Sequence, residues 1–248
     1  MNIRDLFKKN DRQPTCSAVI VAAGNAKRMG EDKLMMQLGC MPVLARTLLA
    51  FQNCSLVDEI IVVTRMEKVE EIAGLCKKYG ISKASKVIRG GKTRTESALA
   101  GVSEVKSSAS YIAIHDGARP FVTDELISRT VEAAAQYMSA VPVIFSTDTL
   151  KAIDENGVVT GPIDRDRTAR VQTPQVFDAD LIKGALSKAV SDGLTLTDDC
   201  SAVEIMGVKT HTVPGDEDNI KLTTPRDVLI AELILKNRGD YSEDRARV

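Results

Sequence analysis

Short apolar runs alternate with amphipathic stretches along most of this chain. The runs rich in Val, Ile and Ala, which have the length of buried strands, cover residues 18–22, 60–64, 86–89, 111–115 and 140–145. The stretches with apolar side chains at helical spacing cover residues 42–51, 67–79, 93–105 and 123–136. This alternation predicts an α/β protein with a parallel sheet, right-handed crossovers and covering helices.

Local signals mark several of the predicted helix ends. Thr123 is suited to cap the helix that follows it, and Gly80 is suited to close the helix before it. Thr224, Pro225 and Asp227 have the spacing of a capped helix start with Pro in the first turn. Further on, the pattern predicts helices over residues 178–190 and 197–205 and a strand over residues 208–213.

The pattern changes character at Thr149. The sequence TLKAID is followed by Glu155, Asn156 and Gly157 and then by VVTGPI, which predicts a two-stranded hairpin with an Asn-Gly turn. A lone hairpin is only marginally stable in water. We therefore expect an arm, at about residues 147–172, that packs on a second subunit.

Length and composition fit one domain of ordinary size. We expect a polar extension at residues 1–14, a single domain at 15–238 and a charged tail at 239–248. The five cysteines are odd in number and scattered, and no stretch resembles a signal peptide or a membrane span, so we expect a cytoplasmic protein. Because 33 basic residues balance 34 acidic ones, general nucleic-acid or membrane-surface binding is disfavoured.

Three loops that follow predicted strands carry the candidate chemistry. Residues 24–33, 90–94 and 116–120 should converge where the carboxyl ends of parallel strands meet. The first loop combines glycines with Lys27, Arg28 and Lys33, which suits a polyphosphate, although an ordinary turn with solvated charges has the same composition.

Other site types are disfavoured by particular residues. The sequence GGKT at residues 90–93 fails as a phosphate-binding P-loop because Lys86 stands where the motif needs Gly, and only Asp116 keeps a P-loop NTPase as an alternative. The opening loop lacks the dinucleotide fingerprint, and two histidines are too few for an imidazole metal cluster. Taken alone, Asp116 with Arg119 could form a salt-bridged turn, and Lys221 could lie in a solvated loop.

Seven segments in order carry a resemblance to a known family. The segments AAGNAKRMGEDK, GGKTRTESALAG, IHDGARP, TDTLKA, VQTPQVF, LTDDCSAVE and DNIKLTTP resemble the 2-C-methyl-D-erythritol 4-phosphate cytidylyltransferases. The resemblance implies a Rossmann-like sheet and a homodimer formed through a protruding β-hairpin arm. It also implies transfer of CMP from CTP to methylerythritol phosphate by direct in-line attack, with release of pyrophosphate and a need for Mg²⁺.

The resemblance assigns roles to residues by position. Arg28, Lys33 and Lys221 match the catalytic cations. The positions that match CTP-binding residues are Ala22, Ala23, Gly24, Gly91, Arg94 and Ser97. The positions that match substrate-binding residues are Asp116, Arg119, Thr149, Arg165 and Thr197, of which Asp116 is also the candidate metal ligand. Thr149 and Arg165 lie on or beside the arm and would act across the dimer, and Thr173 is a supporting position.

Two departures from the family pattern concern the nucleotide. Ala26 replaces a second Gly of the opening loop, where a Cβ restricts positive φ, and Lys92 replaces a frequently acidic residue. A ribitol 5-phosphate cytidylyltransferase has a similar set of loops and is the nearest alternative. A nucleotide-binding regulator without turnover is a further one, and it leaves the cations and Asp116 unexplained.

Overall fold

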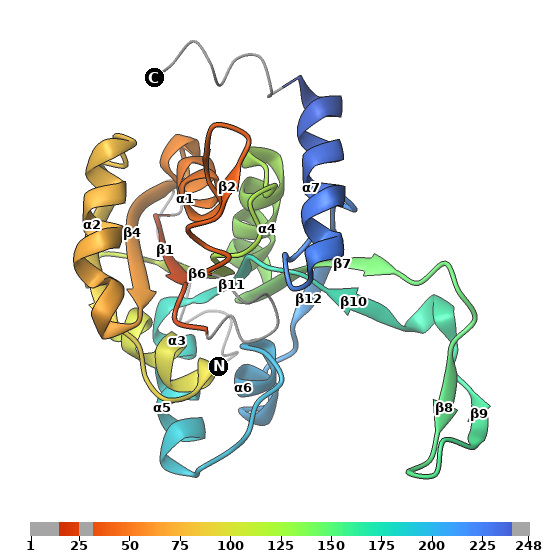
Figure 1. Cartoon of the computed structure of the whole chain (residues 1–248). Helices are drawn as coiled ribbons and strands as arrows, with labels where there is room; N and C mark the ends of the chain where they lie inside the picture. Colours follow the sequence, from red (N-terminus) through yellow and green to blue (C-terminus); the bar gives the residue numbers. More distant parts are fainter. Residues whose placement is uncertain (1–14, 25–31, 240–248) are drawn as a thin grey trace.

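A mixed sheet forms the centre of the molecule in the computed structural model, which describes residues 15–24 and 32–239 (Figure 1). Its strand order is β10-β7-β11-β6-β1-β4-β5, and β12 also pairs with β7. The strands are β1 (Cys16–Val21), β4 (Val57–Thr64), β5 (Ala84–Arg89), β6 (Tyr111–Asp116), β7 (Ser139–Phe145), β10 (Ala169–Val171), β11 (Gln175–Asp178) and β12 (His211–Pro214).

Most neighbours in this sheet are parallel, which confirms the predicted fold class. β1 runs parallel to β4 and β6, β4 to β5, and β12 to β7. β11 lies antiparallel between β6 and β7, and β10 pairs antiparallel with β7. The sequence analysis did not predict β10 and β11, because both are short and the chain between them contains Pro174.

Helices cover both faces of the sheet. They are α1 (Val43–Asn53), α2 (Val69–Lys78), α3 (Arg94–Ser103), α4 (Asp124–Tyr137), α5 (Ala179–Ser191), α6 (Cys200–Ile205) and α7 (Pro225–Arg238). Side chains of β1 point alternately to the two faces, so Ala18 and Ile20 contribute to the core under α1, α2 and α4. Val19 contributes to the second core, under α3, α5 and α6. The result is a three-layer α/β/α body.

Several helices and strands begin or end at other residues than the sequence predicted. The helix predicted over residues 67–79 is a short 3-10 turn, η2 (Met66–Lys68), followed by α2. The helix predicted from Thr197 begins only at Cys200, because the Asp198 carboxylate accepts the Ser201 N–H at 3.1 Å and Thr197 stays in the loop. The predicted strand over residues 208–213 is β12, which begins at His211.

The last helix stands beside the sheet and closes a third, smaller core. Thr224 and Asp227 form the predicted capping box, with Pro225 at the helix start. Ala231, Ile234 and Leu235 of α7 pack with the loop strand β2 (Gln37–Leu38), the start of α1 and Leu222. β2 pairs with β3 (Met41–Pro42). The docked helix thereby fixes the segment that carries Lys221.

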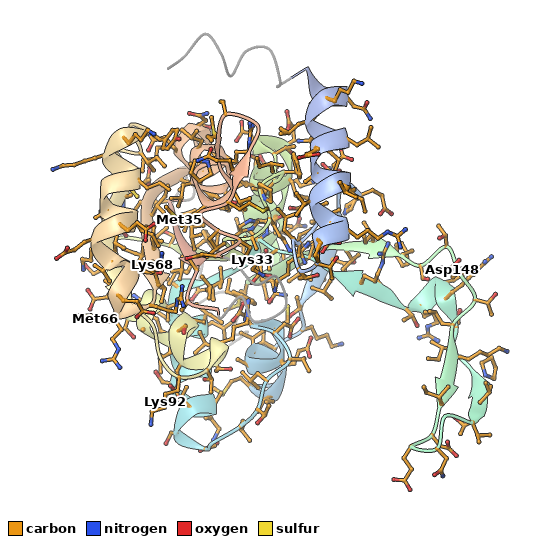
Figure 2. All side chains as sticks on the ribbon, viewed as in Figure 1. Lys33, Met35, Met66, Lys68, Lys92 and Asp148 are labelled. Carbon is orange, nitrogen blue, oxygen red and sulfur yellow. The ribbon has the colours of Figure 1, made fainter. Side chains whose placement is uncertain are left out.

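The predicted hairpin is confirmed as a separate pair of strands. β8 (Lys151–Ile153) and β9 (Val159–Pro162) pair antiparallel outside the main sheet and project from the body (Figure 1), and their side chains stand clear of it (Figure 2). Gly157 has φ +81°, the left-handed conformation that favours Gly in this turn. The extension at residues 1–14 and residues 240–248 of the tail lie outside the described residues, and the proposed division into extension, domain and tail stays a prediction.

Candidate active site

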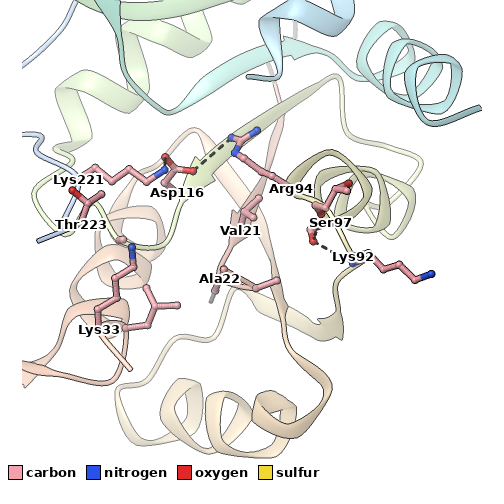
Figure 3. Close-up of a pocket in the computed structure, with 15 residues that line it drawn as sticks. Val21, Ala22, Lys33, Lys92, Arg94, Ser97, Asp116, Lys221 and Thr223 are labelled. Atoms are coloured by element: carbon pink, nitrogen blue, oxygen red, sulfur yellow. Dashed lines mark hydrogen bonds and ion pairs between the residues drawn. The ribbon is translucent and has the colours of Figure 1, made fainter. Parts of the chain in front are cut away.

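A cavity of about 300 Å³ opens where the carboxyl ends of β1 and β6 meet the start of α3 (Figure 3). It is lined by Val21, Ala22, Ala23, Gly24, Lys33, Leu34, Gly91, Lys92, Thr93, Arg94, Ser97, Asp116, Ala118, Lys221 and Thr223. These residues lie in or directly beside the three predicted loops, in the first turns of α3, and in the segment before α7. Ligands of open α/β sheets bind at such an edge.

The loop after β1 brings backbone groups and one lysine to the cavity. Ala22 is fixed by its N–H, which donates to the Val63 carbonyl at 2.7 Å, so the chain after it lies along the cavity wall. Lys33 returns to the same wall and donates from Nζ to the Leu222 carbonyl at 3.0 Å. Its neighbour Asp32 forms ion pairs of 3.3 Å with both Arg65 and Lys68. The end of the opening loop is therefore tied to two other parts of the body.

The loop after β5 depends on glycine for close packing. A Cβ on Gly90 would lie 2.9 Å from the Ala23 Cβ, and a Cβ on Gly91 would overlap the Glu96 side chain. The Gly91 N–H donates to Ser97 Oγ at 3.1 Å, and Thr93 caps α3 by accepting the Glu96 N–H at 3.1 Å. Bare backbone thus forms this side of the cavity.

Asp116 lies among three cationic side chains at the end of β6. Lys221 Nζ is 2.8 Å from Asp116 Oδ2, Arg119 Nε is 3.7 Å from the same oxygen, and Arg94 Nη2 is 3.6 Å from Oδ1. Burial by itself would raise the pKa of Asp116, but Lys221, followed by Arg94 and Arg119, outweighs burial and holds that pKa well below its usual range. Asp116 is therefore an ionised, acceptor-only group facing the cavity.

Arg94 is bound to a second, more deeply buried carboxylate. Its Nη1 and Nη2 donate to the two oxygens of Asp199 at 2.8 and 2.7 Å, and the Asp199 side chain is 1% exposed. Burial alone would lower the pKa of Arg94, but Asp199 outweighs it and raises the pKa. The cation is permanently charged, forms a two-bond fork with Asp199, and lies in a longer ion pair of 3.6 Å with Asp116.

A buried histidine fixes the loop that carries Asp116. Thr173 Oγ1 accepts the Asp116 N–H at 3.1 Å and lies 3.0 Å from His115 Nδ1. The Arg119 carbonyl, 3.3 Å from Nε2, can only accept, so the ring proton lies on Nε2 and the Thr173 hydroxyl donates to Nδ1. Burial, the largest cause, lowers the pKa of His115 to about 3. The neutral ring therefore has the hydrogen-bonded structural role.

The structure brings most of the predicted site residues together. Those that line the cavity are Ala22, Ala23, Gly24, Lys33, Gly91, Arg94, Ser97, Asp116 and Lys221. Arg119 lies directly behind Asp116, with its Nη1 donating to the Asn219 carbonyl at 2.7 Å. Thr149 and Arg165 belong to the projecting arm, and Thr197 lies before α6, where its hydroxyl pairs with Ser201. Arg28 and Ala26 lie outside the described residues.

The sequence analysis missed two residues of the site. Thr223 lines the cavity and donates from Oγ1 to Asp227 at 2.9 Å. Asp199 holds Arg94 although the two are 105 residues apart in the chain. Both residues lie in segments that carry the family resemblance, LTDDCSAVE for Asp199 and DNIKLTTP for Thr223, but neither was assigned a role.

The cavity offers limited ligands for a metal ion. No cluster of three or more His, Cys, Asp or Glu side chains suitable for a metal occurs within residues 15–24 and 32–239. Asp116 is the one acidic side chain among the residues that line the cavity. Mg²⁺ commonly binds through one or two carboxylates together with substrate phosphates, so this donor set fits a metal that a polyphosphate brings with it.

The helices in the described part of the chain are all too short or too polar to span a bilayer.

Comparisons with known proteins agree on one relationship. The family model for 2-C-methyl-D-erythritol 4-phosphate cytidylyltransferase matches residues 16–237. A protein of this name from Halalkalibacterium halodurans is 41% identical over 224 residues, which cover 90% of this chain and 97% of that protein. One from Caldanaerobacter subterraneus subsp. tengcongensis is also 41% identical, over 89% of this chain and 98% of its own.

Solved structures give the same result. The crystal structure of 4-diphosphocytidyl-2C-methyl-D-erythritol synthase from Anaerococcus prevotii superposes with a TM-score of 0.81 at 31% identity, covering 90% of this chain and 97% of that one. The cytidylyltransferase from Thermus thermophilus gives 0.73 at 30% identity, covering 88% and 98%.

The match to these relatives, together with the Rossmann-like body and the cavity at its carboxyl edge, identifies a nucleotidyltransferase. The family match spans nearly the whole described chain. The chain belongs to the 2-C-methyl-D-erythritol 4-phosphate cytidylyltransferase family.

Proposed function

We propose that this chain transfers CMP from CTP to 2-C-methyl-D-erythritol 4-phosphate and releases pyrophosphate. The observation that carries the proposal is the convergence of Lys33, Lys221 and Asp116 with the bare backbone of Gly91 around one cavity. Family membership supplies the pair of substrates. A phosphate oxygen of the sugar attacks the α-phosphorus of CTP in line, and no covalent enzyme intermediate is needed.

Positioning and charge neutralisation account for the catalysis. Lys33 and Lys221, together with Arg28 of the opening loop, hold the triphosphate and stabilise the negative charge that develops at the α-phosphate. Ala22, Ala23 and Gly24 approach the triphosphate through their backbone. Support for this arrangement comes from the two lysine Nζ atoms, which already lie at the cavity next to carbonyl and carboxylate oxygens.

The nucleoside lies on the other wall of the cavity in this proposal. Gly91 and Ser97 contact the cytosine and its ribose, and the backbone held close by the hydrogen bond from the Gly91 N–H to Ser97 Oγ would favour a pyrimidine over a larger base. Arg94, in the same motif, is the further candidate contact to CTP.

The sugar phosphate takes the remaining side. Asp116, ionised and acceptor-only, accepts hydrogen bonds from its hydroxyl groups, and Thr197 is a further contact. Arg119, Thr149 and Arg165 bind its phosphate. Of these, Arg119 is nearest to the cavity, through its ion pair with Asp116.

Enzymes of this family are nucleotidyltransferases that use a divalent metal, and we propose Mg²⁺ for this chain. Asp116 and the triphosphate oxygens would hold the ion. When bound, it would neutralise phosphate charge and help to orient the α-phosphate for attack.

The arm completes the site of a second subunit in the proposed homodimer. Ile153, Val158 and Val159 are 65%, 59% and 58% exposed, so the hairpin leaves apolar surface unburied in one chain. A partner that covers these side chains would also receive Thr149 and Arg165 near its own cavity. The exposure supports the proposal because a solitary hairpin has little stability of its own.

Product formation from purified components tests the function. Purified protein is incubated with CTP and Mg²⁺ and with either methylerythritol phosphate or ribitol 5-phosphate, and pyrophosphate release is measured. We expect turnover that depends on methylerythritol phosphate. Turnover with ribitol 5-phosphate alone would replace the proposed substrate, and CTP binding without pyrophosphate release would indicate a regulator.

A further inference from the structure

Asp199 lies directly before α6 and does not line the cavity. Its carboxylate is nevertheless tightly paired with Arg94, which does line the cavity. Its carboxylate takes both terminal nitrogens of Arg94, at 2.8 and 2.7 Å. Its own position is fixed by Gln175 of β11, whose Oε1 accepts the N–H groups of Asp199 and Cys200 at 3.0 Å each. A residue of the sheet therefore fixes Asp199, and Asp199 in turn holds Arg94.

The other neighbour of Arg94 is held less closely. Arg94 Nη2 lies 2.7 Å from Asp199 but 3.6 Å from Oδ1 of Asp116, beyond hydrogen-bond distance (Figure 3). Lys221 and Arg119 both approach the opposite oxygen, Oδ2. Among the residues that the structure describes, none donates a hydrogen bond to Oδ1. Within the described part of the chain, this oxygen of a cavity-lining carboxylate therefore has only the longer ion pair with Arg94 and keeps its capacity to accept a hydrogen bond.

We propose that Asp199 is a positioning residue that holds Arg94 back from Asp116 and so keeps Oδ1 free to accept a hydroxyl group of the polyol phosphate. This inference rests on the proposed function, in which Asp116 binds the sugar hydroxyls. It also changes the role of Arg94, which acts here on Asp116 and not as a ligand of CTP.

The physical reason is competition between two carboxylates for one guanidinium. A guanidinium forms its best contact as a two-bond fork with a single carboxylate, and Asp199 provides it. Without the negative charge on Asp199, Asp116 is the next carboxylate within reach of Arg94. Arg94 would then close the remaining 3.6 Å and occupy the oxygen that the substrate needs.

Asp199→Asn tests the inference because it keeps the side-chain size and removes the charge. We expect kcat/KM for methylerythritol phosphate to fall about 10- to 100-fold, the usual effect of losing a partner that orients a functional group. The Kd of CTP, measured by calorimetry without the sugar phosphate, should stay within about twofold of the wild type. Asp192→Asn, which removes a carboxylate paired with Lys188 at 2.7 Å on the surface of α5, is the matched control and should change neither quantity.

A double variant separates positioning from simple support of α6. In Arg94→Met/Asp199→Asn the cation that blocks Asp116 is absent, and the buried ion pair becomes a neutral pair, which proteins commonly tolerate. We expect kcat/KM for methylerythritol phosphate to recover at least about tenfold relative to Asp199→Asn. A double variant no better than the single one would overturn the inference, since a supporting role gives no such recovery.

Arg94→Lys decides the matter if Asp199→Asn does not fold, because lysine still gives Asp199 a cation. We expect the Kd of CTP to stay within about threefold of the wild type, whereas kcat/KM for methylerythritol phosphate falls severalfold, because lysine cannot form the two-bond fork with Asp199. A rise of about tenfold or more in the Kd of CTP would make Arg94 a nucleotide ligand and refute the inference. Wild-type protein that forms no product from CTP and methylerythritol phosphate would instead refute the proposed function.

Discussion

The cavity and the arm differ in which side chains they bury: the cavity buries charged side chains, whereas the arm exposes apolar ones. At the cavity, Asp116 and Asp199 are 11% and 1% exposed and each is paired with a cation of the same chain. On the arm, apolar side chains such as Ile153 are mostly exposed, and among the described residues the two strands pair only with each other. The comparison teaches that one chain arranges the cavity by itself, whereas the arm leaves its apolar side chains uncovered, which is the basis of the proposed homodimer.

Loss of Lys33 should have the largest effect. In Lys33→Ala the cavity keeps its shape but loses a cation that faces the triphosphate, so we expect kcat to fall by about 100- to 1000-fold, or about 3 to 4 kcal/mol of barrier. Steady-state pyrophosphate release measures this. Lys188→Ala on the surface of α5 is the control and should retain full activity, and a Lys33 variant with near-normal kcat would remove the lysine from the catalytic set.

Mixed dimers test whether the arm and the cavity of different chains form one site. Lys33→Ala and Arg165→Ala should each be inactive, but a hybrid of the two has one site with both residues intact. Random mixing of equal amounts should therefore restore about a quarter of wild-type activity. Activity is compared before and after joint refolding, and mixtures that stay inactive while both parents dimerise would contradict a shared site.

A charge on the arm should weaken the dimer without disturbing the body. Val159→Asp places a carboxylate on apolar surface that the partner is expected to cover, so we expect the dimer dissociation constant to rise at least about tenfold. Analytical ultracentrifugation measures the dissociation constant, and thermal unfolding of the monomer should be unchanged. Val159→Thr, nearly the same shape, is the matched control with a smaller effect. A dimer equally stable with Asp at this position would show that the arm tip lies outside the interface.

The smallest effect concerns the pH dependence of stability. The pKa of His115 falls from 6.5 to about 3 on folding, so below pH 6.5 the unfolded chain binds a proton that the folded chain does not. The free energy of unfolding should therefore decrease as the pH falls, by up to about 1.4 kcal/mol per pH unit from this residue. Urea unfolding between pH 6.5 and 5 measures the slope. His115→Gln should flatten it, and an unchanged slope would mean that the ring is protonated in the folded protein.

The sequence predicted the body well because its signals are local. The apolar runs of β1, β4, β6 and β7 and the capping residues Thr123 and Thr224 specify their elements from a few neighbours. β10 and β11 were missed because four or fewer residues around Pro174 give no clear periodicity, and their pairing with β7 and β6 is long-range.

The residues of the candidate site likewise divide into those that local signals predicted and those that only tertiary packing brings together. Strand-end loops follow from topology, so the meeting of Lys33, Gly91 and Asp116 was predictable. The pairing of Arg94 with Asp199 was not, since it joins α3 to the start of α6 through tertiary packing alone. Lys33 and Lys221 are far apart in the chain, but both were predicted because the family resemblance assigned a catalytic role to each.

The antiparallel course of β7, β10 and β11 has a consequence for how such a protein can change. The chain leaves the sheet at the end of β7 and returns to it through β10 and β11, which both pair with β7. For the folding of the body, the arm is therefore equivalent to one long loop. Doubling the length of such a loop costs only about 0.6 kcal/mol of closure entropy. The arm can therefore be shortened, lengthened or re-sequenced in evolution with little effect on the sheet, so the sequences of the arm and of the catalytic body are free to diverge.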